Sequence, residues 1–151
     1  MIEFDETKCR NVVYGRNVRI VQPSNLYDCT LGDNVFIGPF VEIQSNCVIG
    51  PGSRVQSHTF ICSGVTLGKE VFVGHGVNFV NDRFTGGRRA FGDASRMETT
   101  EIEDGVLIGS GATILPSHIV SGVTVGAGAV VVKSILHPGT YAGNPARRIG
   151  S

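Results

Sequence analysis

Two histidines and an Asn-Asp pair are the side chains of this sequence best suited to chemistry. His58 and His75 are seventeen positions apart, and Asn81-Asp82 follows soon after. An imidazole titrates near neutral pH, so either ring could take a proton from a nucleophile. We predict that His58 is a general base and that His75 orients a substrate. The alternative for each histidine is a hydrogen bond to the backbone at a turn.

Asn81 comes two residues after Phe79, an apolar residue of the regular pattern described below. Its side chain is therefore expected to leave the core. Asn and Asp both favour turns, so the pair could simply begin a loop. The functional alternative is that Asn81 holds a substrate in place.

The elements that must position these side chains repeat every six residues. A small or β-branched residue usually comes four places after each aliphatic residue, and Gly often follows the aliphatic residue directly. The pattern extends upstream to Tyr14 and downstream from Ile102 to Ser134, with two slips of one residue. Its uninterrupted part has an apolar residue at Leu31, Ile37, Ile43, Ile49, Val55, Ile61, Leu67, Val73 and Phe79.

A period of six matches neither an α-helix nor a simple alternation along a strand. It fits a short strand followed by a turn, with Gly supplying the positive φ angles of sharp corners. Strands this short cannot bury a face alone, so successive coils must stack at roughly 4.8 Å. The repeat predicts one all-β solenoid domain over residues 1–151, with about six coils. His58 and His75 are then expected on neighbouring coils near one corner.

The repeat is interrupted once, by an excursion at residues 83–101 that reads RFTGGRRAFGDASRMETTE. A solenoid tolerates insertions at its corners because the stacked core is not disturbed. We predict that the chain leaves the solenoid after the Asn-Asp pair and rejoins it at Ile102. A mobile, solvated loop without ligand contacts is the alternative to a loop that forms a site.

The composition is that of a single soluble domain. The chain has 151 residues, 41% of them hydrophobic, and its 13 Lys and Arg residues balance 13 Asp and Glu residues. This balance does not indicate nucleic acid or a membrane surface as a partner. No apolar run resembles a secretory signal or a membrane span, so we expect a cytoplasmic protein. The four cysteines lack metal-binding spacing and are expected to be reduced, with Cys47 facing the core.

The repeat resembles that of the hexapeptide-repeat acyltransferases. Their repeat of an aliphatic residue, Gly, two variable residues, a small residue and one more folds as a left-handed parallel β-helix of triangular cross-section. Residues 141–147 also resemble the AGNPA signature, followed by Lys or Arg, that ends many members. The resemblance implies the same fold here, including the left-handed winding, which the general preference for right-handed crossovers would not predict.

Two motifs resemble a narrower branch that N-acylates amino groups of nucleotide-linked sugars. Residues 56–61 read QSHTFI, and residues 74–82 read GHGVNFVND where that branch typically has GHGVMFIND. Asn78 and Val80 therefore depart from the branch, and the Pro-Arg often found after the Asn-Asp pair is absent. These departures bear on the identity of the sugar more than on the chemistry.

The resemblance implies transfer of an acetyl group from acetyl-CoA to the amine of a nucleotide-linked amino-deoxy sugar. The expected substrate is a dTDP-3-amino-3,6-dideoxyhexose for bacterial surface polysaccharide synthesis, with dTDP favoured over UDP. Members of the family are trimers with sites in the grooves between subunits, so a homotrimer is expected. A neutral amine can attack the thioester directly, which demands mainly positioning and no metal.

The expected site residues follow from the matching positions and from the repeat. Asn81 is expected to hold the amino sugar or the acetyl carbonyl, with His58 as the second catalytic residue. Contacts with the sugar nucleotide are expected from His75, Asp82, Glu42, Gln44, Arg83 and Arg88. Contacts with the coenzyme are expected from Gly76, Gly109, Gly111, Ala112, Ser121, Gly126, Ala127, Lys133, Asn144, Pro145, Ala146 and Arg147. For Glu42 and for the basic residues at the end of the solenoid, the alternative is plain solvent exposure.

Three other functions fit parts of the pattern. An O-acetyltransferase acting on a small sugar or a serine-like alcohol would share the fold and need stronger base assistance. A non-catalytic scaffold would bind no coenzyme. The same fold hosts γ-class carbonic anhydrases with three metal-binding histidines, but the four histidines here include no close pair, and His118 is placed in an inward position.

Overall fold

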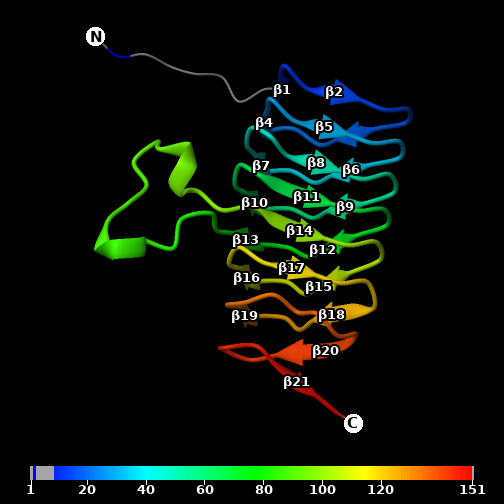
Figure 1. The fold of residues 1–151 in the computed structure, drawn as a ribbon. Helices are drawn as coiled ribbons and strands as arrows, with labels where there is room; N and C mark the ends of the chain where they lie inside the picture. Colours follow the sequence, from blue (N-terminus) through cyan, green and yellow to red (C-terminus); the bar gives the residue numbers. More distant parts are fainter. Residues whose placement is uncertain (1, 3–8, 151) are drawn as a thin grey trace.

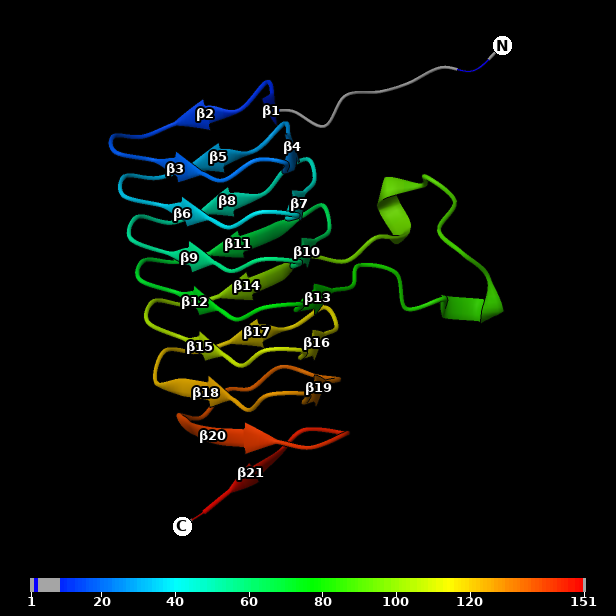
Figure 2. The same cartoon turned by 180° about the vertical axis from the view of Figure 1, so that it is seen from behind.

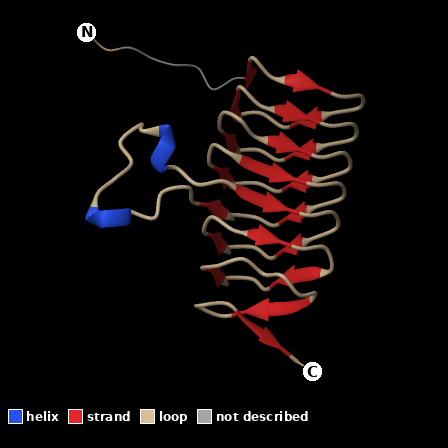
Figure 3. Ribbon diagram, viewed as in Figure 1, coloured by secondary structure: helices blue, strands red, loops and turns tan. Residues whose placement is uncertain are grey.

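The chain winds into a stack of coils, with β1 and β21 at opposite ends of the stack (Figure 1). The computed structural model describes residue 2 and residues 9–150. Each strand from β1 to β20 pairs in parallel with a strand one coil away, so three sheets run along the stack. Strands dominate the described structure (Figure 3), as expected for an all-β protein. The architecture is a parallel β-helix, consistent with the left-handed winding expected.

We call the three sheets A, B and C. Sheet A contains β1 (Cys9–Arg10), β4 (Asn25–Tyr27), β7 (Glu42–Ile43), β10 (Phe60–Ile61), β13 (Asn78–Phe79), β16 (Thr113–Ile114) and β19 (Val130–Val131). Sheet B contains β2 (Val13–Tyr14), β5 (Thr30–Leu31), β8 (Val48–Ile49), β11 (Val65–Leu67), β14 (Thr100–Ile102) and β17 (His118–Ile119). Sheet C contains β3 (Arg19–Ile20), β6 (Phe36–Ile37), β9 (Arg54–Val55), β12 (Phe72–Val73), β15 (Leu107–Ile108), β18 (Val123–Val125), β20 (Gly139–Ala142) and β21 (Arg147–Ile149).

The core consists of the side chains that point into the stack. The aliphatic column predicted by the repeat is buried from Leu31 to Phe79 and again from Ile102 to Ile114. The small residues four places later are buried too, among them Cys47, whose inward position is thus confirmed. Each fully buried aliphatic side chain stabilises the fold by about 1.5–3 kcal/mol relative to exposure. The six-residue period is therefore the packing pattern of one continuous core.

Glycine after the inward residue allows neighbouring coils to approach closely. A Cβ added to Gly74 would lie 2.6 Å from the backbone N of Ser110 in the next coil. At Gly38 the nearest atom would be the backbone N of Ser57, at 2.8 Å. A side chain at these positions would force the coils apart, so Gly maintains their spacing.

Three corners join the sheets, and we name each after the sheets it connects. The A–B corner contains, on successive coils, Ser45, Ser63 and Asn81. The C–A corner contains Phe40, His58 and Gly76, whose φ angles are 60°, 64° and 64°. The B–C corner contains Asn34, Gly52 and Glu70.

The excursion leaves the A–B corner and projects away from the stack (Figures 1 and 2). It contains two short 3-10 turns, η1 (Thr85–Gly87) and η2 (Ala94–Arg96). Strand β14 begins at Thr100, so the chain rejoins the stack two residues before Ile102, the predicted point of return. Thr100 pairs with Val65 of the previous coil. The ladder of sheet B therefore continues across the interruption.

The solenoid is longer than the repeat predicts. Sheets of seven, six and eight strands make about seven turns, where the pattern from Tyr14 predicts about six. The added strands are β1 at one end of the stack and β20 and β21 at the other. Tyr14 is exposed in β2, which is the end strand of sheet B among the described residues. The other end is closed by an antiparallel hairpin of β20 and β21. No described helix has the length and apolar character to cross a membrane.

Candidate functional site

Asn81 is held at the A–B corner by the residue one coil before it. Its Nδ2 donates to the Oγ of Ser63 at 2.9 Å and to the backbone O of Ser63 at 3.2 Å. The side chain is half-buried and lies outside the core, as predicted. The backbone O of Asn81 accepts the N–H of Glu98 at 3.0 Å, which joins the two ends of the excursion.

Asp82 organises the excursion. Its Oδ2 accepts the N–H of Ala90 at 2.7 Å, and its Oδ1 accepts the N–H of Phe84 at 2.9 Å. These hydrogen bonds, first that from Ala90, hold the pKa of the Asp82 carboxyl below its ordinary value. Ala90 is buried although it belongs to a projecting loop. Both oxygens of Asp82 thus support the loop, and a contact between Asp82 and a substrate stays a prediction.

Arg83 fastens the base of the excursion to the stack. Its guanidinium donates to the backbone O of Pro116 and, at 3.2 Å, to that of Val132. Its Nε lies 3.0 Å from Oε2 of Glu98. A planar guanidinium can serve several acceptors at once, which explains why Arg stands here. Because these donors have protein partners, the predicted contact of Arg83 with the sugar nucleotide stays a prediction.

The outer part of the excursion is held together by Arg96. Its guanidinium donates to the backbone O of Thr85 at 2.6 Å and to that of Arg89 at 2.9 Å. Arg88, predicted to contact the sugar nucleotide, is exposed directly after η1. Phe91 is exposed as well, with the Arg89 guanidinium 4.7 Å from its ring centroid. The excursion therefore exposes arginine side chains and the Phe91 ring, and hydrogen bonds from Arg96 hold its backbone in shape.

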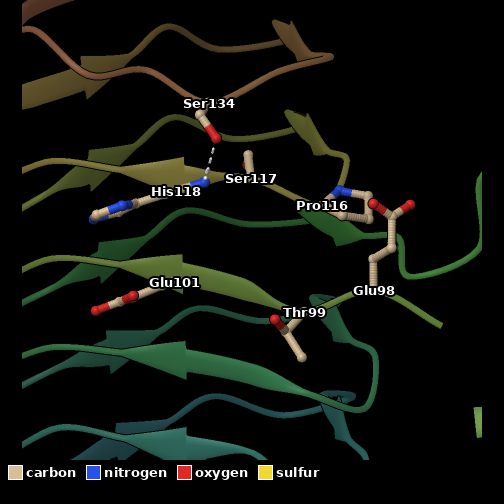
Figure 4. Close-up of a pocket in the computed structure, with 7 residues that line it drawn as sticks. All are labelled: Glu98, Thr99, Glu101, Pro116, Ser117, His118 and Ser134. Atoms are coloured by element: carbon tan, nitrogen blue, oxygen red, sulfur yellow. Dashed lines mark hydrogen bonds between the residues drawn. The ribbon is translucent and has the colours of Figure 1, made fainter. Parts of the chain in front are cut away.

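A polar pocket of about 270 Å³ lies beside the base of the excursion (Figure 4). It adjoins Asn81 because Glu98, which lines the pocket, donates its backbone N–H to Asn81. The lining residues are Glu98, Thr99, Glu101, Pro116, Ser117, His118 and Ser134. The pocket thus joins the end of the excursion to the next coil.

His118 lines this pocket and faces outward, so its predicted inward position is wrong. The one-residue slip gives the inward position to Ile119, which is fully buried. The Nε2 of His118 lies 2.7 Å from Oε1 of Glu103. The other oxygen of Glu103 accepts the N–H of Ser121 at 2.9 Å. The Ser121 N–H and then the His118 ring hold the pKa of Glu103 below its ordinary value.

The His118–Glu103 pair escaped the sequence prediction, although the repeat carried a signal for it. His118 pairs with Glu101 in the register of sheet B. Counting one coil back from His118 therefore reaches a segment with carboxylates at two positions, Glu101 and Glu103. A histidine oriented by a carboxylate is a common arrangement for a general base.

His58 and His75 lie on adjacent coils at the C–A corner, as predicted. The Nδ1 of His75 lies 2.9 Å from the Oγ of Ser57, and its backbone N–H reaches the Oγ of Ser110 at 3.1 Å. The ring of His58 lies beside Phe40, with centroids 4.9 Å apart and planes inclined by 34°. Both histidines are exposed, and their rings contact a hydroxyl and an aromatic ring rather than the backbone. Both imidazoles are accessible to a substrate.

The two halves of the predicted site lie on different corners of one chain. Asn81 follows β13 at the A–B corner, whereas His75 precedes β13 at the C–A corner. Glu42 begins β7 of the same sheet and pairs with Phe60 as predicted, and Gln44 directly follows β7. The carboxylate of Glu42 accepts a hydrogen bond from the Nε2 of Gln44 at 3.1 Å. Gln44 thus lies toward the A–B corner of Asn81, where it accepts the N–H of Ser63, whereas Glu42 is in register with Asn78 at the other end of the strand.

The small residues predicted to contact the coenzyme fall into three places. Gly76, Gly111 and Ala127 lie at the C–A corner. Gly109 and Gly126 begin this corner, directly after strands β15 and β18 of sheet C. Ser121 lies at the B–C corner, so it does not join this group. Ala112 is fully buried, and its predicted contact with coenzyme is wrong. Ala112 is the small inward residue four places after Ile108.

The predicted coenzyme residues near the end of the chain border a second pocket. It has a volume of about 190 Å³ and is lined in part by Lys133, Ala146 and Arg147. Asn144 and Pro145 are exposed between β20 and β21. The backbone N–H of Ala146 donates to the O of Val130 at 2.8 Å. The hairpin therefore places basic side chains beside the last strand of sheet A.

Metal ligands are not assembled within the described residues. No group of three or more His, Cys, Asp or Glu side chains there could hold a metal ion. The four cysteines in the described part of the chain are all free thiols. Burial raises the pKa of the Cys29 and Cys62 thiols to about 12.

Comparison with known families identifies the repeat itself. Residues 28–63 match the family described as bacterial transferase hexapeptide (six repeats). Residues 99–133 match the family described as hexapeptide repeat of succinyl-transferase. Both segments are hexapeptide repeats. They lie on either side of the excursion, and the hexapeptide repeats account for most of the buried aliphatic column.

Several solved structures resemble most of this chain. A perosamine N-acetyltransferase variant from Caulobacter crescentus, in complex with CoA and GDP-perosamine, is 20% identical with a TM-score of 0.68, covering 93% of this chain and 58% of that chain. WeeI from Acinetobacter baumannii is 27% identical with a TM-score of 0.66, covering 88% and 55%. A variant of AntD, an N-acyltransferase from Bacillus cereus in complex with dTDP and coenzyme A, is 21% identical with a TM-score of 0.56, covering 93% and 83%.

The extent of these matches bounds what they show. The chain spans 58% of the perosamine N-acetyltransferase and 55% of WeeI. At 20% and 21% sequence identity, the likeness to the perosamine enzyme and to AntD shows a similar fold and nothing further. No curated protein matches the chain significantly.

Proposed function

We propose that this protein is an acetyl-CoA-dependent N-acetyltransferase that acts on the amine of a nucleotide-linked amino-deoxy sugar. The observation that carries the proposal is the A–B corner, where the half-buried Asn81 lies between the excursion and a polar pocket. The QSHTFI and GHGVNFVND motifs, which resemble the sugar N-acyltransferase branch, place Asn81 at the matching position. A dTDP-linked 3-amino-3,6-dideoxyhexose is the first candidate substrate.

The chemistry requires only that the amine and the thioester meet in the right orientation. The neutral amine attacks the thioester carbonyl, the C–N bond forms, the C–S bond breaks and CoASH leaves with the proton lost by nitrogen. Holding both reactants in place supplies much of the acceleration. His58 or His75 would accept the proton late in this step, since both rings are accessible.

We propose a homotrimer in which the site lies between two subunits. Asn81 and the two histidines lie at opposite edges of sheet A, so one subunit does not bring them together. A cyclic trimer joins two different surface patches of neighbouring subunits. The A–B corner of one subunit would then face the C–A corner of the next, and the exposed aromatic rings of the excursion would contact the neighbour.

The coenzyme would extend along the C–A corner toward the end of the stack. Gly76, Gly111 and Ala127 leave the backbone open to an extended pantetheine arm. Lys133 and Arg147 would bind the phosphates, because both are exposed cations beside the terminal pocket. The fold is compatible with this arrangement, since proteins of similar fold bind CoA together with GDP-perosamine or dTDP.

The decisive experiment is a thiol-release assay with acetyl-CoA. The acceptors are dTDP-, UDP- and GDP-linked sugars that carry an amine at C3 or C4. We expect CoASH release with one dTDP-linked sugar, and mass spectrometry should show the acetyl group on nitrogen. If no sugar of the panel releases CoASH, the proposed function is wrong.

O-acetyl transfer is a second candidate, favoured by one observation. The His118–Glu103 pair beside the pocket is the oriented base that an alcohol nucleophile requires. An O-acetyltransferase would lose activity on alcohols when His118 is replaced by Ala. Activity on an amino sugar that survives His118→Ala would favour the N-acetyltransferase.

A further inference from the structure

The orientation of the Asn81 side-chain amide is fixed by its neighbour. The Nδ2 of Asn81 donates to the backbone O of Ser63, and a carbonyl oxygen can only accept hydrogen bonds. The nitrogen must therefore face Ser63, and the Oδ1 atom must point away from it. A second hydrogen bond, from Nδ2 to the Oγ of Ser63 at 2.9 Å, holds the same orientation. The Oδ1 of Asn81 accepts no hydrogen bond from any described residue.

Ser63 is itself held by a chain of side-chain hydrogen bonds across sheet A. Its backbone N–H donates to Oε1 of Gln44 at 3.2 Å. The Nε2 of Gln44 donates to Oε2 of Glu42 at 3.1 Å, and the other oxygen of Glu42 accepts Nδ2 of Asn25 at 2.8 Å. The four residues Asn25, Glu42, Gln44 and Ser63 lie on three successive coils.

Each side-chain amide in this series of hydrogen bonds has only one possible orientation. The Gln44 amide must present oxygen to the Ser63 N–H and nitrogen to the Glu42 carboxylate. The Asn25 amide must present nitrogen to the same carboxylate. Networks in which every member is satisfied are rigid, so the orientation of Asn81 is set before any substrate binds.

We propose that Ser63 is the positioning residue that presents Asn81 Oδ1 as a hydrogen-bond acceptor for an N–H of the substrate amine. Asn81 thus holds the amine and not the acetyl carbonyl, which needs a donor. A neutral primary amine has two N–H groups and one lone pair, so one N–H bound to Asn81 leaves the lone pair free to attack. Asn81 takes no proton, because a carboxamide is not a base. This inference rests on the proposed function and names the group that Asn81 recognises.

The test compares three substitutions with a matched control on the same corner. Ser63→Ala removes the hydroxyl, the nearer of the two acceptors, and leaves Asn81 with only the longer bond to the backbone O. Ser63→Cys keeps the size but accepts more weakly, and Ser63→Thr keeps the hydroxyl. Ser45 occupies the equivalent position one coil earlier, and its hydroxyl makes no hydrogen bond with a described residue. Steady-state kinetics are measured with the amino sugar that is acetylated in the panel.

We expect Ser63→Ala to lower kcat about tenfold and to raise KM for the sugar, with KM for acetyl-CoA unchanged. Ser63→Cys should show the same pattern, Ser63→Thr should stay near the parent, and Ser45→Ala should have no effect. A purely structural defect would change both KM values and the melting temperature. Parent-like kinetics in Ser63→Ala and Ser63→Cys would overturn the inference.

Asn81→Asp separates an acceptor role from a donor role. A carboxylate at this position would stabilise the ammonium form of the sugar, so the alkaline rise of kcat/KM should move to higher pH. If Asn81 instead donates to the acetyl oxygen, the rate falls without a shift of the profile.

Binding without acetyl-CoA tests the inference independently of turnover. Isothermal titration compares the dTDP-linked 3-amino sugar, at a pH where its amine is neutral, with the 3-deoxy analogue that lacks the amine. The parent protein should prefer the amino sugar, and Ser63→Ala should lose most of that preference. Equal affinities in the parent protein would refute the inference, whereas a missing CoASH release with this preference intact would refute only the proposed function.

Discussion

His75 and Asn81 lie at opposite ends of strand β13, on two different corners of the same coil. The chain between them crosses the whole of sheet A, so no side-chain rotation brings the imidazole to the amide. We therefore propose that a site that uses both takes them from two subunits. The same holds for His58, which lies one coil from His75 at the same corner.

Under the proposed trimer, mixing two single variants should restore activity that each variant lacks alone. We expect Asn81→Ala and His58→Ala each to be impaired alone. In random mixtures, each site between subunits has about one chance in four of receiving both intact residues. Activity after denaturation and joint refolding should therefore exceed the mean of the two variants several-fold. A mixture of Asn81→Ala with the double variant is the control and should show no gain.

Acid should loosen the excursion through Asp82. Its carboxylate accepts the N–H groups of Ala90 and Phe84, which lower its pKa. This contribution is present above the unfolded pKa, about 3.9, and is lost as pH falls through the lower folded value. Asp82→Asn should loosen the loop at every pH, with faster hydrogen exchange at the Ala90 amide. Asp104→Asn, which affects the distant Lys69 amide, should leave Ala90 protected.

Arg83→Lys should disturb the site without unfolding the stack. An ammonium group cannot reproduce the planar donor set that serves Pro116, Val132 and Glu98. We expect kcat/KM to fall about tenfold or more, since small displacements of positioned groups are costly. The melting temperature should change little, because the core is not touched. Arg16→Lys, at a remote and exposed ion pair, should leave kcat/KM unchanged.

Gly74→Ala should destabilise the stack. The added Cβ would lie 2.6 Å from the backbone N of Ser110, so the coils must separate locally at a cost of about 1–3 kcal/mol. Gly128→Asn provides the contrast, because its Cβ would meet no atom within 4 Å and Asn tolerates the positive φ. Urea denaturation of both variants measures the difference. Equal stabilities would contradict a spacing role for Gly74.

The six-residue period was sufficient to predict the core because it directly records which side chains point inward. Leu31 through Phe79 are buried as the period requires. The errors arose where the period slips or a local motif competes with it. His118 and Ile119 both stand near a slip, and only the packed structure shows that Ile119 takes the inward position. Ala112 belongs to a Gly-rich run that resembles an open surface, although the period itself places it inside.

The candidate site was predicted in part. The corner position of Asn81 follows from coil length, and its partner Ser63 stands one eighteen-residue coil earlier. The anchoring of Arg83 was out of reach, because its acceptors are backbone carbonyls 33 and 49 residues away along the chain. Backbone carbonyls have no signature in residue type, so only the fold reveals which of them meet a guanidinium.

The pairing of Thr100 with Val65 has a consequence for how such a protein can diversify. The register of sheet B is fixed by residues on both sides of the excursion, so it does not depend on how many residues lie between. The length and sequence of the excursion can therefore change while the stack and Asn81 keep their places. Under the proposed function, exchanging the excursion at its two ends would change the sugar that is bound without rebuilding the stack.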